Sequence, residues 1–159
     1  MNVKLAKSAS GFTIIEAVIA VVVLVIAVLG ASAFRYQAAL HARRADLQMT
    51  AARTTLLLCE TWRGAIDPNA FAPAEDLGSQ LTIETSAEGP ETPDGFTALG
   101  NYRITPNGLD HYYATLSWKD MSSRLRALNV AVEWNQAGSG SENFVDADKS
   151  FKLTTYITD

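Results

Sequence analysis

Several residue types that carry chemistry are scarce in this chain of 159 residues, which has one cysteine, two histidines and five prolines. With Cys59 alone, an internal disulfide and a cysteine-based metal site are both excluded. We expect Cys59 to be a buried, inert thiol. No proline occurs before Pro68, so no proline breaks a helix in the first third of the chain. The formal net charge of -4 excludes a global basic field for nucleic acid, although a local basic patch remains open.

Catalytic patterns are also missing. His41 and His111 belong to no spaced set of ligands, and Ser122 and Ser123 do not sit in a nucleophile elbow. The sequence contains neither a glycine-rich phosphate loop nor a pair of catalytic carboxylates. The pattern therefore predicts a protein that is not an enzyme and that uses no cofactor.

One acidic turn has the residue types for Ca²⁺, because Glu142, Asp146 and Asp148 all carry carboxylate oxygens. However, Lys149 adjoins them and the spacing of an EF-hand is missing. We therefore expect a solvated acidic turn and no metal site.

What the sequence does contain is an apolar run from Phe12 to Phe34, in which Glu16 is the only formally charged residue. At about 1.5 Å per residue, such a helix matches the roughly 30 Å of a bilayer's hydrocarbon. A carboxylate inside such a segment costs about 2.5 to 3.5 kcal/mol, so Glu16 is expected to serve a function and to need a partner. The alternative is a carboxylate that snorkels to the membrane interface from a helix end.

The helix is predicted to continue beyond the apolar run, as an amphipathic segment over residues 35–64. A stripe of apolar residues recurs there at steps of four and seven, as on one helix face: Leu40, Leu47, Ala51, Leu58 and Trp62. The end of the helix is predicted from Arg63 in the last turn, Gly64 as a left-handed cap and Pro68 shortly after. Residues 12–63 should therefore form one long helix.

Residues 65–159 have the composition of a β-domain. Loops rich in proline and glycine are expected at 65–78 and 88–95. Alternating or β-rich runs predict strands near Leu81–Thr85, Tyr102–Thr105, Tyr112–Lys119, Leu125–Trp134 and Phe151–Ile157. The expected fold class is α+β, with a long helix whose distal half packs on a mostly antiparallel sheet of roughly three to five strands.

The first eleven residues are short, polar and basic, which is typical of a targeting leader. In an ordinary secretory interpretation, Ala31-Ser32-Ala33 is the cleavage site and the mature protein begins at Phe34. Against this interpretation, Glu16 interrupts the apolar core, and the core is longer than the usual 7 to about 15 residues.

A second interpretation comes from the segment Lys7-Ser8-Ala9-Ser10-Gly11-Phe12-Thr13-Ile14-Ile15-Glu16. It resembles the processing site of type IV prepilins and of the related pseudopilins of type II secretion, in which a basic leader ends in Gly before Phe, Thr, two aliphatic residues and Glu. The resemblance implies cleavage after Gly11 by a membrane aspartic peptidase and N-methylation of Phe12. It also implies that Glu16 contacts the Phe12 amine of a neighbouring subunit, and that the chain has the pilin fold.

The resemblance further implies partners and a location. The partners are other pilin or pseudopilin subunits, a prepilin peptidase with N-methyltransferase activity, an assembly platform in the inner membrane, and membrane lipid before assembly. The leader would lie in the cytoplasm and the β-domain outside the inner membrane, on a single-pass helix. Charge does not decide this orientation, because basic residues flank both ends of the apolar run.

The chemistry of such a pairing is sound in its own right. An amine and a carboxylate are each costly in hydrocarbon, and pairing them across two subunits removes both penalties. The pair would also fix the axial register of a helical assembly, as a buried polar group does in a coiled coil.

The late strands, with Thr115-Leu116-Ser117-Trp118 and Leu128–Trp134, resemble those of V-type minor pilins and type I minor pseudopilins. The lack of a proline before Pro68 departs from major pilins and favours a minor subunit that primes or caps assembly. An alternative function is a competence-type minor pilin whose β-domain binds DNA or a surface ligand. That alternative needs a basic stripe formed by Arg103, Lys119, Arg124 and Arg126.

Overall fold

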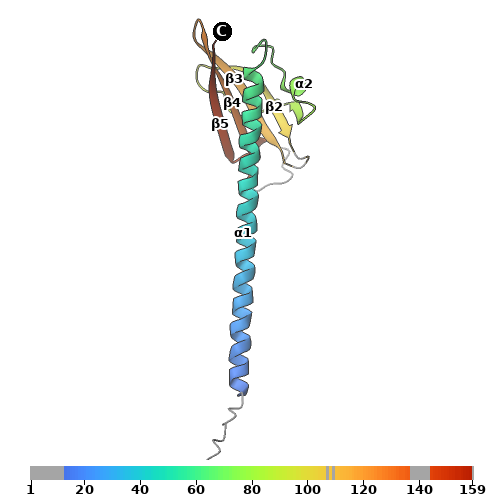
Figure 1. The fold of residues 1–159 in the computed structure, drawn as a ribbon, viewed down its shortest axis with the longest axis vertical. Coiled ribbons are helices and arrows are strands. Elements are labelled where there is room, and N and C mark those ends of the chain that lie inside the picture. The colour runs from blue at the N-terminus through green and yellow to red at the C-terminus, as the bar shows by residue number, and fades with distance from the viewer. Residues whose placement is uncertain (1–12, 107, 109, 137–143, 159) are drawn as a thin grey trace, which may run out of the picture. The chain divides into compact units, whose positions relative to one another are not determined.

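The structure of the chain is a computed structural model that describes residues 13–106, 108, 110–136 and 144–158. One long helix, α1 (Ile14–Arg63), is followed by a five-stranded antiparallel sheet, as Figure 1 shows. The expected α+β fold class is confirmed. The chain divides into two compact units, Met1–Arg43 and Arg44–Asp159.

Helix α1 begins after Thr13 and ends at Arg63, as the sequence predicts. Its end differs from the prediction in one detail, because the glycines with positive φ among the described residues are Gly95 and Gly108 and do not include Gly64. The Gly64 N–H instead donates to the Glu60 and Thr61 carbonyls, at 3.1 and 3.2 Å, so the last turn simply tightens. The predicted left-handed cap at Gly64 is therefore wrong.

Within the first unit, α1 is apolar on all sides from Ala17 to Phe34. Every residue from 13 to 39 is exposed, and we call residues 14–39 the exposed segment of α1. By length and composition, this helix is capable of crossing a membrane, and its apolar window lies near the N-terminus. The predicted membrane-length helix is therefore present.

The sheet of the second unit is a simple meander, because its spatial order β1-β2-β3-β4-β5 follows the chain. Each strand pairs antiparallel with the next. The strands are β1 (Thr82–Thr85), β2 (Thr97–Thr105), β3 (Tyr112–Ser122), β4 (Leu125–Trp134) and β5 (Lys149–Thr158).

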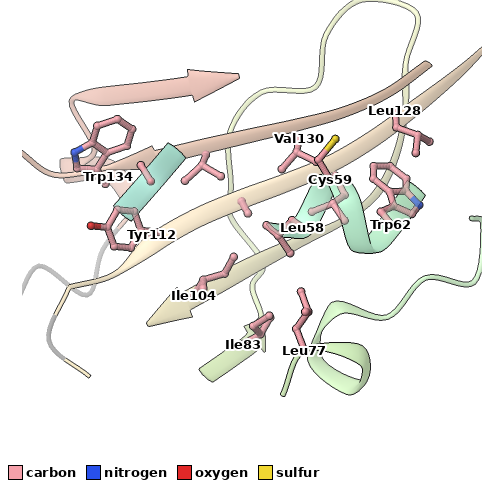
Figure 2. Packing of buried hydrophobic residues seen from close by; sticks show 14 of the residues in the cluster. Leu58, Cys59, Trp62, Leu77, Ile83, Ile104, Tyr112, Leu128, Val130 and Trp134 are labelled. Carbon is pink, nitrogen blue, oxygen red and sulfur yellow. The ribbon is translucent and has the colours of Figure 1, made fainter. Parts of the chain in front are cut away.

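The hydrophobic core lies between one face of this sheet and residues 47–62 of α1, which we call the packed segment. Figure 2 shows Leu58, Cys59 and Trp62 of the helix beside Leu128 and Val130 of β4. The predicted stripe is buried except at Leu40, which is half-buried. The stripe is also wider than predicted, since Thr54, Thr55 and Cys59 are buried as well.

The opposite face of the sheet is covered in part by the segment between β1 and β2. Thr115 donates a hydrogen bond of 2.7 Å to the carbonyl of Pro90, a buried residue of that segment. Beside Thr115, Ser117 and Asn129 are buried and face each other across β3 and β4. This burial of polar residues was not predicted, because their alternation in the sequence indicates a solvated face.

Two short elements lie where loops were expected or beside them. A helix of four residues, α2 (Pro73–Asp76), lies inside the predicted loop 65–78, and a 3₁₀ turn, η1, covers Phe144–Asp146. Strand β2 begins five residues before the predicted Tyr102 and carries a bulge between Ala98 and Gly100. Such a bulge breaks the alternation on which the prediction depends.

Candidate functional site

The first turn of α1 positions Glu16, the residue that the sequence singles out. The Glu16 N–H donates to the side-chain oxygen of Thr13 at 3.3 Å and to the Thr13 carbonyl at 3.1 Å. Thr13 is thus the N-cap of the helix, and Glu16 is its third helical residue. We did not predict this cap from the sequence, although Thr-x-x-Glu is a typical capping pattern.

The Glu16 side chain is exposed, and no hydrogen-bond donor or cation in the described part of the chain contacts its carboxylate. Its position in the first turn is favourable by about 0.3 to 1 kcal/mol, because the amide dipoles leave positive charge at a helix N-terminus. That gain is smaller than the roughly 2.5 to 3.5 kcal/mol that a carboxylate costs within a membrane. The arrangement therefore leaves room for a cation from outside this part of the chain. The predicted processing residues, Gly11 and Phe12, lie outside the described residues.

The four basic residues proposed for DNA binding do not form one stripe. Arg103 lies beside Glu84, with its Nε 3.2 Å from the carboxylate. Arg126 binds Asp120 at 2.6 Å and lies over the Trp118 ring, on the sheet face that α1 covers.

The other two cations are placed differently. Lys119 lies on the opposite face to Arg126, because it pairs with Ala127, the next residue of β4. Its ammonium nitrogen is 5.9 Å from the centre of the Phe96 ring, while Arg124 is exposed in the turn between β3 and β4. The geometry spreads these charges over two faces and a turn, which does not favour the continuous basic track that a nucleic-acid backbone needs.

The acidic turn considered for Ca²⁺ is described in part, since Glu142 lies outside the described residues. Asp148 accepts a hydrogen bond of 2.7 Å from the Gln136 N–H, and its other oxygen is 3.6 Å from the Lys149 ammonium. Across the residues that the structure describes, no group of three or more His, Cys, Asp or Glu side chains is placed to hold a metal ion.

The two histidines and the cysteine lie in surroundings that do not indicate a catalytic role. His41 is exposed on α1, and the His111 ring lies 3.0 Å from the Thr105 hydroxyl. Cys59 is buried, and this burial raises the pKa of its thiol, with a smaller contribution from the negative charge of Glu60. A raised pKa disfavours the reactive thiolate, as expected for an inert cysteine.

Comparisons of the chain with protein-family models, with curated proteins and with solved structures find no match in any of the three.

Proposed function

We propose that this chain is a minor subunit of a type IV pilus or of a type II secretion pseudopilus. In this proposal, a prepilin peptidase removes residues 1–11 and the new amino terminus on Phe12 is methylated. The subunit waits in the inner membrane on its single helix, with its β-domain on the extracytoplasmic side. An assembly platform then transfers the helix from lipid into the core of a filament.

One observation carries the proposal. A helix that is exposed over residues 14–39, and apolar on every side from Ala17 to Phe34, carries one carboxylate, in its first turn, with no partner in the described part of the chain. An apolar surface of this kind needs lipid or other helices around it, and the carboxylate needs a cation at the same depth. The freed amine of Phe12 on a neighbouring subunit supplies such a cation, next to the position where α1 begins.

One feature supports a minor role. No proline lies within α1, whereas the long helix of the major pilins that the chain resembles usually carries one in its membrane half. We infer that the subunit primes or caps a filament and does not form its bulk.

The first test is mass spectrometry of the N-terminus of the protein purified from its own membranes. The proposal predicts that the mature chain begins with N-methylated Phe12. A chain that begins at Phe34 would instead identify a soluble exported domain. A functional chain that retains residues 1–11 would contradict the proposal outright.

The second test replaces the carboxylate. We expect Glu16→Ala to be processed normally but to enter filaments at least tenfold less, because the neighbour's amine then stays unpaired in an apolar core, a loss of about 3 to 5 kcal/mol. The matched control is Ile19→Ala, an exposed residue one turn further along α1. Incorporation is measured by immunoblotting sheared filaments against total membranes. Equal incorporation of Glu16→Ala and the wild type would refute the pairing.

A further inference from the structure

The apolar surface of α1 ends at a definite place. After Glu16, the next formally charged residue is Arg35, and the residues between them are apolar or small. From Ala17 to Phe34, the helix rises about 27 Å, which is close to the thickness of a bilayer's hydrocarbon. If the exposed segment spans a membrane, Arg35 therefore lies at the boundary between hydrocarbon and headgroups.

The residues at this boundary have the chemistry of a membrane interface. Phe34 and Tyr36, on either side of Arg35, are 74% and 64% exposed. Tyrosine is enriched at this depth because its ring is apolar and its hydroxyl is polar. Arg43, eight residues beyond Arg35, is also exposed. We call Phe34, Arg35, Tyr36 and Arg43 the collar.

The collar's two guanidinium groups, those of Arg35 and Arg43, form no ion pair in the part of the chain that the structure describes. The nearest acidic residue in the sequence is Asp46, three positions after Arg43, and it forms no ion pair with Arg43. Arginines form their strongest hydrogen bonds with phosphate and carboxylate oxygens.

Helix geometry brings Arg43 within reach of the headgroups. Its Cα lies about 12 Å beyond that of Arg35, which is further out than the roughly 5 to 8 Å of one headgroup layer. However, side chains on a helix slope toward its N-terminus, which here is toward the membrane. A long arginine side chain also extends its charge back to the interface. Both collar arginines can therefore reach the headgroups of the same leaflet.

The part of the chain that follows the collar has the opposite net charge. Residues 44–159 contain sixteen Asp and Glu against nine Lys and Arg. An anionic surface repels such a domain overall, so the attraction comes from the basic residues beside the span, among them the collar arginines.

We propose that the collar binds the phosphate groups of anionic phospholipids in the leaflet at the C-terminal end of the span, so that the unassembled subunit gathers these lipids around its helix. This inference rests on the membrane-anchored stage of the proposed function. It goes beyond that function by naming the lipid class and the side chains that select it.

The test measures lipid selectivity of the full chain in phosphatidylcholine vesicles by electron paramagnetic resonance. Trace spin-labelled phosphatidylglycerol is compared with spin-labelled phosphatidylcholine. At about 1 kcal/mol, or about fivefold, per basic residue near the surface, the two collar arginines should together give a preference for phosphatidylglycerol of up to about 30-fold. This preference should fall toward equality in about 1 M salt, where charges are screened within about 3 Å.

Two variants assign the effect to the collar. Arg35→Gln/Arg43→Gln should lose at least half of the preference, whereas Arg53→Gln should keep it. Arg53 is the matched control because it is an exposed arginine of the same helix, also without an ion-pair partner among the described residues. Glutamine is a good helix former, so these substitutions keep α1 intact.

The outcomes separate this inference from the proposed function. An inserted chain that binds both lipids equally, or a double variant that keeps the full preference, would overturn the collar alone. Loss of filament incorporation in the double variant, without lipid selectivity in the wild type, would also overturn it and would identify acidic groups of a neighbouring subunit as the true partner. A chain that does not co-migrate with the vesicles in a flotation gradient would overturn the membrane stage as well.

Discussion

The exposed and packed segments of α1 belong to one continuous helix, yet they follow different sequence rules. The exposed segment is apolar on every side from Ala17 to Phe34 and has no buried residue. The packed segment is less apolar overall, but seven residues of α1 are buried there, on one side. A core-forming helix is therefore recognised by the spacing of its apolar residues, whereas an all-apolar helix requires an apolar environment of its own.

The packed segment stabilises the fold, whereas the exposed segment offers the surface for the proposed assembly. Burial of the packed segment holds the β-domain together, because tertiary packing supplies most of a helix's stability in a folded protein. The exposed segment contributes nothing comparable within the chain. Its apolar surface is available for lipid or for other subunits, in line with the proposed function.

The test with the largest expected effect makes the same substitution, Leu to Ala, in both segments. Leu58→Ala, at a residue with 0% exposure, should lower the free energy of unfolding by about 2 to 5 kcal/mol, because it leaves a cavity against the sheet. Leu24→Ala, at a residue with 63% exposure, should change it by less than about 0.5 kcal/mol. Urea unfolding of the full chain in detergent micelles, followed by tryptophan fluorescence, measures both. Similar losses in the two variants would refute the division.

A second test sharpens the comparison through pH. Burial raises the pKa of Tyr112 to about 12, and the negative charge of Asp110 adds to this effect. Its hydroxyl donates to the carbonyl of Leu47 in the packed segment, at 3.3 Å. Because the pKa of Tyr112 in the folded protein exceeds the ordinary value of 10.0, the protonated phenol stabilises the folded state. This contribution to the free energy of unfolding is complete below pH 10 and is lost as pH rises through about 12.

We therefore expect the free energy of unfolding to fall by up to about 1.4 kcal/mol per pH unit between pH 10 and 12. Tyr112→Phe should remove this part of the slope, whereas Tyr156→Phe, at an exposed tyrosine of β5, should keep it. Urea unfolding at a series of alkaline pH values provides the measurement. A slope that Tyr112→Phe leaves unchanged would show that this phenol does not titrate with folding.

The helix and the strands could be predicted from sequence because their determinants are local. Apolar periodicity and the stop signals after Trp62 predicted α1 to its last residue, Arg63, and the β-rich runs placed all five strands. Two predictions failed because an alternative local solution exists. The loop expected at 65–78 contains α2, because the proline at its first position suits the first turn of a helix, and Gly64 ends α1 without a left-handed conformation.

The burial of Thr115, Ser117 and Asn129 could not be predicted for a different reason. Thr115 donates to the carbonyl of Pro90, in a loop more than twenty residues away in sequence, and Asn129 donates to the Thr154 hydroxyl of β5 at 2.9 Å. Nothing local in a β-strand indicates such a partner. The candidate site shows the same limit, since the residues around Glu16 predict its position at the helix start but its proposed partner belongs to another subunit.

The smallest test compares one arginine from each unit. Arg126, in the second unit, binds Asp120 at 2.6 Å and the side-chain oxygen of Asn69 at 2.8 Å, and its guanidinium carbon lies 4.2 Å from the centre of the Trp118 ring. Its side chain is only 17% exposed. Arg126→Gln should therefore cost about 1 to 2 kcal/mol in the same unfolding experiment, because two charged hydrogen bonds and a cation–π contact are lost together.

Arg35→Gln, in the first unit, removes a guanidinium that has no ion-pair partner among the described residues, so its effect on unfolding should stay within about 0.5 kcal/mol. The two substitutions make the same chemical change, and any difference between them measures what the contacts around Arg126 contribute. Equal effects would mean that solvent screens the Arg126 contacts as fully as it does an exposed ion pair. In that case, the division between the units would depend on apolar packing alone, and the polar contacts of the β-domain would serve orientation without adding stability.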